Sequence, residues 1–155
     1  MMWVGFALIT VVCWGLYGAY LHKGAMGFEN DRMKAFLFVG VAYFLIAVVG
    51  PLVVITLTGK DPKFEFKPEG IKLSLFAGVL GAVGALTVLF ALNTNPTKGP
   101  AAASQVMSLV FAGAPVVAAI YAILTRKADT PIDWRFFVGI VMAATGGAMV
   151  TYFKP

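Results

Sequence analysis

Long apolar stretches alternate with short polar ones along this chain of 155 residues. Five stretches come close to the roughly 20 residues that a helix needs to cross a bilayer. They are 3–21, 35–57, 73–92, 101–125 and 136–153. The ten-residue alternating pattern of membrane β-strands is absent, and no connection is long enough for a soluble domain. The pattern therefore predicts an all-α fold, a polytopic membrane helix bundle with five transmembrane helices in one domain, 1–155.

The fourth stretch, 101–125, has no charged residue and two unlike sides. Small or polar residues recur along it at steps of three and four, which places them on one side of a helix. They are Ala101, Gln105, Ser108, Ala112, Pro115, Ala119 and Ala122. Helices in a membrane associate through small residues and polar contacts, because lipid is as apolar as leucine. We therefore expect this side to contact other helices or to face a cavity.

Composition supports the membrane class, since 60% of the residues are hydrophobic and only 12% are charged. A soluble domain has about 25% charged residues. The net charge of +5 at first suggests nucleic acid, but the basic residues lie in the short polar connections, where they orient and anchor spans. We expect the lipid bilayer as surroundings and no nucleic-acid partner. Cys13, the only cysteine, is expected to be a small packing residue.

Basic residues divide unevenly between the two sides of the membrane that five spans define. Seven share the side of the N-terminus: Lys60, Lys63, Lys67, Lys72, Arg126, Lys127 and Arg135. Five fall on the other: Lys23, Arg32, Lys34, Lys98 and Lys154. The positive-inside rule then predicts a cytoplasmic N-terminus in an inner or plasma membrane. The margin of two is small enough to permit insertion in both orientations.

Two prolines interrupt predicted spans, Pro51 in the second and Pro115 in the fourth. Proline has no N–H, so the carbonyls of Ala47 and Phe111 lose their usual helical donors, and we expect helix kinks. A purely structural kink is one interpretation. A broken helix that lines a transporter binding site is the other.

Six polar or aromatic residues inside the spans are candidates for a substrate cavity. They are Thr10, Trp14, Tyr17, Tyr43, Gln105 and Ser108. Thr10, Trp14 and Tyr17 share one side of a helix, and the Trp14 indole N–H needs a partner near mid-span. Aromatic faces hold apolar or cationic parts of a ligand, and the Gln105 amide can hydrogen-bond one. The alternative is that Trp14 packs on helices or lipid and that Gln105 bonds a neighbouring helix.

Chemistry for catalysis is missing from the sequence. No Asp, Glu, His, Lys or Arg lies well inside a predicted span, and the only histidine, His22, lies at the end of the first. Metal-ligand spacing, nucleotide-binding loops and paired carboxylates are also absent. We therefore expect no enzymatic activity, no metal and no cofactor.

Several short motifs resemble the EamA-like domain of the drug/metabolite transporter superfamily. They are Cys13-Trp14-Gly15, Phe90-Ala91-Leu92, Ala101–Ser104, Pro115-Val116, Pro131-Ile132-Asp133-Trp134, Gly139-Ile140 and Gly146-Gly147. The order of five spans also fits, so the resemblance covers nearly the whole chain. Two features depart from it. Family members often have Gly-Glu after the fourth span, where this chain has Thr125-Arg126-Lys127, and many carry two such domains.

The resemblance implies transport of a small organic solute or metabolite by alternating access. The two halves of the family are inverted repeats, so a single half needs a partner. That partner is a second copy in a homodimer, antiparallel if the chain inserts both ways, or a related half-transporter. The alternative from another class is a non-transporting membrane subunit that scaffolds a larger membrane complex.

Overall fold

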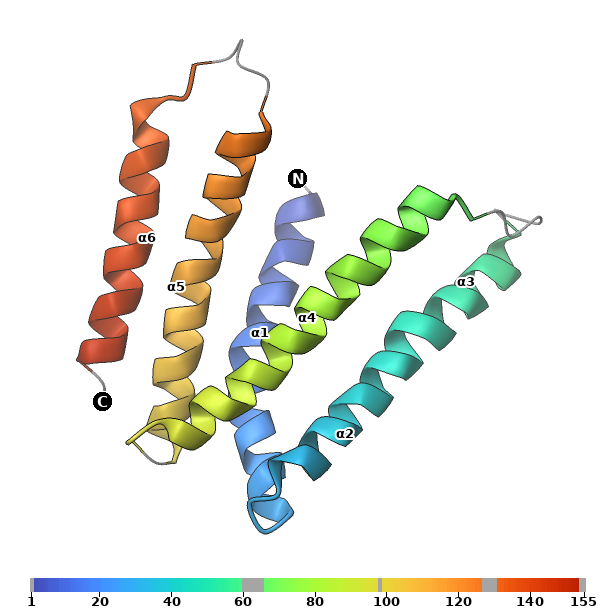
Figure 1. Cartoon of the computed structure of the whole chain (residues 1–155), viewed down its shortest axis with the longest axis horizontal. Helices are drawn as coiled ribbons and strands as arrows, with labels where there is room; N and C mark the ends of the chain where they lie inside the picture. The colour runs from blue at the N-terminus through green and yellow to red at the C-terminus, as the bar shows by residue number, and fades with distance from the viewer. Residues whose placement is uncertain (1, 60–65, 98, 127–130, 154–155) are drawn as a thin grey trace. The chain divides into compact units, whose positions relative to one another are not determined.

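The computed structural model describes residues 2–59, 66–97, 99–126 and 131–153, and within these ranges the chain is helical and has no strand (Figure 1). Five of its helices are long and apolar enough to cross a bilayer. They are Met2–Gly27, Arg32–Thr58, Pro68–Thr94, Pro100–Thr125 and Trp134–Tyr152. This confirms the predicted all-α class and the predicted number of spans, and it is consistent with an integral membrane protein.

Seven helical elements make up these spans. They are α1 (Met2–Gly27), α2 (Arg32–Phe44), η1 (Leu45–Val49), α3 (Gly50–Thr58), α4 (Pro68–Thr94), α5 (Pro100–Thr125) and α6 (Trp134–Tyr152). Most helices extend beyond the apolar stretches that predicted them, because polar residues continue the helix after the apolar run ends. The end of α1, for example, includes His22 and Lys23.

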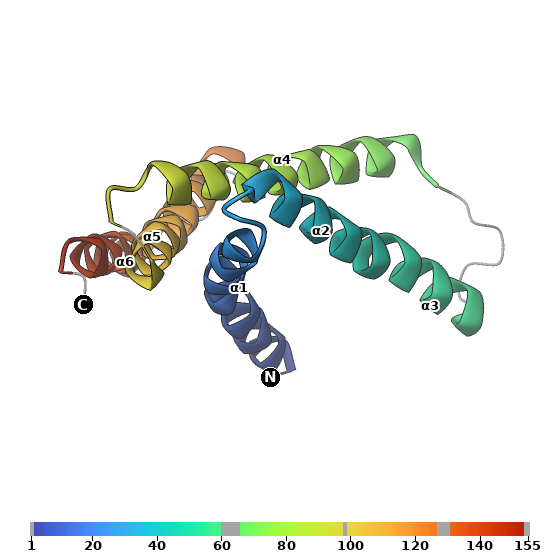
Figure 2. The same ribbon diagram turned by 90° about the horizontal axis from the view of Figure 1, so that it is seen from below.

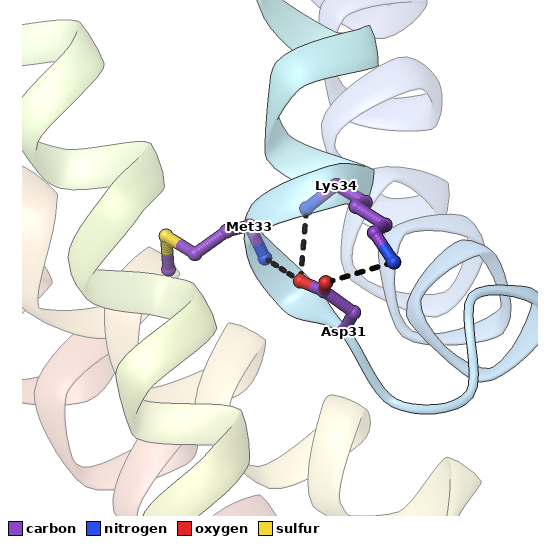
Figure 3. Close-up of polar contacts among 3 residues, drawn as sticks. All are labelled: Asp31, Met33 and Lys34. Carbon is purple, nitrogen blue, oxygen red and sulfur yellow. Dashed lines mark hydrogen bonds and ion pairs between the residues drawn. The ribbon is translucent and has the colours of Figure 1, made fainter.

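Helix ends follow local sequence rules. Asp31 caps α2 by accepting hydrogen bonds from the N–H groups of Met33 and Lys34, each 3.1 Å long, and its carboxylate lies 3.3 Å from the Lys34 ammonium (Figure 3). The hydrogen bond from the Lys34 backbone N–H is the main reason that the pKa of Asp31 lies below its ordinary value of 3.8. Pro68 begins α4, where the N–H that proline lacks would have no helical partner. Gly59, with φ at 58°, ends α3 in the left-handed conformation that glycine accepts without strain.

The chain forms two compact units, of which the first comprises 1–22 and 91–155. Within it, α5 and α6 lie side by side as a hairpin in both views (Figures 1 and 2). At Gly147 an added Cβ would overlap that of Ala112 and lie 3.2 Å from the Ser108 carbonyl oxygen. The two backbones therefore approach closely at this glycine. Small residues allow such close approach between packed membrane helices.

The second unit comprises 23–90, with α2, η1, α3 and most of α4. An Arg32 guanidinium N–H donates to the carbonyl of Leu89 over 3.2 Å, which ties the start of α2 to α4. The rings of Phe28 and Phe38 stack with centroids 5.5 Å apart. Three glycines of α4 differ from Gly147, because an added Cβ at Gly78, Gly81 or Gly84 would have no atom within 4 Å.

Some predictions concern residues outside the described ranges. The lysines counted for membrane orientation include several of these: Lys60, Lys63, Lys98, Lys127 and Lys154. One domain over 1–155 and the cytoplasmic N-terminus stay predictions.

The two prolines occupy different surroundings. α5 continues through Pro115 as one helix. Pro51 instead lies in the first turn of α3, directly after the π-helical turn η1, in which the Gly50 N–H donates to the carbonyl of Leu45. The predicted interruption of the second span therefore coincides with a change of helical register. Kinking at Pro51 and Pro115 stays a prediction.

Candidate functional site

Five of the six cavity candidates lie in the first unit, on α1 and α5. They are Thr10, Trp14, Tyr17, Gln105 and Ser108. Tyr43 belongs to α2 in the second unit and is exposed.

An aromatic cluster forms where α1 meets α5. The Trp14 ring lies 6.0 Å from that of Tyr17 and 6.3 Å from that of Phe111, measured between centroids, and meets Phe111 edge-on. Such separations and edge-on geometry are favourable for aromatic pairs. The Trp14 side chain stays 42% exposed, so its ring can still be reached. The sequence pattern pointed to Trp14 and Tyr17 but not to Phe111, which lies on α5 beside the small-residue stripe.

The spacing of residues on the two helices explains why the cluster forms. Tyr17 and Gly18 follow Trp14 at three and four residues, so all three share one side of α1. Gly18 lets α5 approach, since a Cβ there would lie 2.8 Å from the sulfur of Met107. Phe111 is one helical turn beyond Met107 and so meets the side of α1 that carries Trp14.

Gln105 joins three segments through its amide. Its Oε1 accepts from Asn95 Nδ2 over 3.2 Å, and its Nε2 donates to the Thr151 carbonyl over 3.3 Å. These bonds link the connection after α4, the first turns of α5 and the end of α6. Each amide oxygen accepts twice and each amide nitrogen donates twice, so these two bonds use half of the hydrogen-bonding capacity of Gln105. Neither Asn95 nor Thr151 could be predicted as a partner of Gln105 from the residue pattern.

Ser108 and Thr10 make contacts that their polarity alone did not predict. Ser108 is half-buried, and its carbonyl lies where α5 meets Gly147 of α6. The Thr10 hydroxyl donates to the carbonyl of Phe6 over 3.0 Å within its own helix. The structure thus divides the candidates of the first unit between two contacts: Trp14 and Tyr17 at α1–α5, and Gln105 and Ser108 at α5–α6.

An apolar hollow of about 310 Å³ lies elsewhere, where α5 ends and α6 begins. Its lining residues are Ala122, Ile123, Arg126, Pro131, Ile132, Asp133 and Phe136. None of the six candidates lines it, and the carboxylate of Asp133 is occupied in capping α6 through the Arg135 N–H. Over the described part of the chain, no three His, Cys, Asp or Glu side chains come together as a possible metal site.

No known family model matches the sequence, and no curated protein or solved structure matches it either.

Proposed function

We propose that this protein is a half-transporter subunit of an inner or plasma membrane, which moves a small organic solute by alternating access as a dimer. The aromatic cluster of Trp14, Tyr17 and Phe111 is the observation that supports this most directly. A tryptophan near the middle of a span, partly exposed and flanked by two further rings, is unusual because membrane tryptophan prefers the interface. Aromatic rings at this depth suit the binding of an apolar or cationic organic group.

Two polar residues of the first unit have hydrogen-bonding capacity left, Thr10 one helical turn before Trp14 and Gln105 at the α5–α6 contact. Gln105 keeps one donor and one acceptor position, and the Thr10 hydroxyl oxygen still has a lone pair to accept with. A small-molecule pocket is usually lined by apolar side chains with only a few polar groups among them. The resemblance to the EamA-like domain supports the same function, and it supports completion of the cavity by a second copy or a related half.

Ligand binding to the full-length protein in lipid nanodiscs tests the proposal. We would screen aromatic, quaternary ammonium and neutral polar compounds for an increase in melting temperature. An aromatic or cationic compound is expected to stabilise the native protein, and Trp14→Ala is expected to weaken its binding at least tenfold. Trp3→Ala is the matched control, because Trp3 lies on the same helix and is exposed far from the cluster.

Two results would count against the cavity. Equal loss of binding in both tryptophan variants would show that Trp14 has no special contact with the ligand. Absence of binding and of solute flux, together with stable co-purification of an unrelated membrane protein, would favour the non-transporting scaffold subunit instead.

A further inference from the structure

The second span changes helical register in its middle. Over Leu45–Val49 the backbone is π-helical, and the Gly50 N–H donates to the Leu45 carbonyl, five residues back instead of four. A π turn of this kind holds one residue more than the α-helix on either side of it. Figures 1 and 2 nevertheless show α2 and α3 as one continuous rod. The span therefore carries an extra residue that a regular helix would not need.

Pro51 limits where this extra residue can be accommodated. The next π-type bond toward the C-terminus would run from the N–H of residue 51 to the Ile46 carbonyl, and proline has no N–H. The π turn is therefore stopped on that side. Toward the N-terminus, 33–49 contains no proline, so every residue can donate. A step in that direction replaces a five-residue bond on the C-terminal side of the turn by a four-residue bond. On the N-terminal side a four-residue bond becomes a five-residue bond, so the number of hydrogen bonds is unchanged.

The start of the second span is held, whereas the side chains of the π turn in its middle are exposed. Asp31 caps the start of α2, and Arg32 bonds the carbonyl of Leu89 in α4. The side chains within the π turn, by contrast, are all exposed.

We propose that the π turn is a register switch, which moves between Leu45–Val49 and positions closer to the N-terminus. Each residue that it passes turns by about 100° and shifts by about 1.5 Å, the geometry of one α-helical residue. The first residues passed are 41–44, which include Tyr43. The movement thus changes the direction in which the Tyr43 side chain leaves the helix by about 100°. This movement does not depend on the proposed function.

Pulsed electron paramagnetic resonance on the full chain in lipid nanodiscs tests the switch. Cys13 is first replaced by serine, and spin labels are attached to introduced cysteines at exposed positions. The test pair is Phe44→Cys with Leu57→Cys, about 20 Å apart along the axis, because residue 44 is passed by the turn. The control pair is Leu37→Cys with Leu57→Cys, about 30 Å apart, because both positions lie outside the passed segment.

We expect two distance populations for the test pair and one for the control pair. Deleting Ala47 removes the extra residue, so the test pair should then give one population. Pro51→Ala restores the missing donor and should broaden the test distribution by allowing movement in both directions. A single narrow distance for the test pair in the otherwise native sequence would overturn the proposal, even if the deletion variant fails to fold. Ligand binding does not enter this measurement, so a failure of the proposed function leaves its outcome unaffected.

Discussion

Replacing Gly147 by alanine adds one methyl group at the closest approach of α5 and α6. The new Cβ would overlap the Cβ of Ala112 and would lie 3.2 Å from the Ser108 carbonyl oxygen. Backbone and Cβ atoms cannot rotate away as the end of a long side chain can, so the helices must separate. Overpacking of this kind costs about 1–3 kcal/mol.

Gly146 provides the matched control, because a Cβ added there has no atom within 4 Å. Both substitutions gain the same helix propensity, about 1 kcal/mol for glycine to alanine, so their difference isolates the contact with α5. We would measure the free energy of unfolding in mixed detergent micelles. Gly147→Ala should be less stable than Gly146→Ala by about 1–3 kcal/mol.

The double variant Gly147→Ala with Ala112→Gly tests the cause. It removes the methyl group that the new Cβ meets, so a favourable coupling energy of about 0.5–3 kcal/mol should appear in the double-mutant cycle. Equal stability of the two single variants, or a coupling energy near zero, would refute the close approach at Gly147.

The remaining predictions concern polar contacts. Gln105→Leu should destabilise the protein by about 1–3 kcal/mol, since two hydrogen bonds of about 0.5–1.5 kcal/mol are lost, whereas Ser104→Ala at an exposed position should not. Arg32→Met should speed hydrogen exchange at the start of α2, because it removes the hydrogen bond to the Leu89 carbonyl. Arg32→Lys keeps the positive charge, so it separates the loss of this bond from an effect of charge on membrane orientation. Equal exchange rates in the native protein and Arg32→Met would contradict the prediction. Because its folded pKa is lowered, ionised Asp31 stabilises the protein above pH 3.8, and this stability is lost as the pH falls through the folded pKa. The melting-temperature advantage of the native protein over Asp31→Asn should therefore vanish in acid, and an advantage that persists would contradict the cap.

The sequence predicted the spans well, because long apolar runs are required by the thickness of the bilayer and appear directly in the residue pattern. Contacts between helices were harder, because small residues show where approach is permitted and not which helix approaches. Gly147 contacts α5, whereas Gly78, Gly81 and Gly84 of α4 have open space beside them. Glycine thus marks a helix contact at residue 147 and open space at the three positions of α4.

The candidate site shows the same limit. Polarity grouped Gln105 with Trp14, but they lie at different helix contacts, since neighbouring sides of α5 face α6 and α1. Phe111 was missed as a site residue because an apolar side chain in a span is usually lipid-facing. Pro51 predicted a disturbed helix, yet a missing donor does not indicate whether a kink or a π turn absorbs it.

The orientation of the C-terminus tests the dimeric half-transporter most directly. Two reporters would be fused after Pro155, one active only in the cytoplasm and one only outside. We expect substantial signal from both reporters, because a chain inserted in both orientations can form an antiparallel homodimer. Signal from the outside reporter alone would contradict that homodimer and direct the search to a related partner chain, and signal from the cytoplasmic reporter alone would contradict the five-span orientation itself.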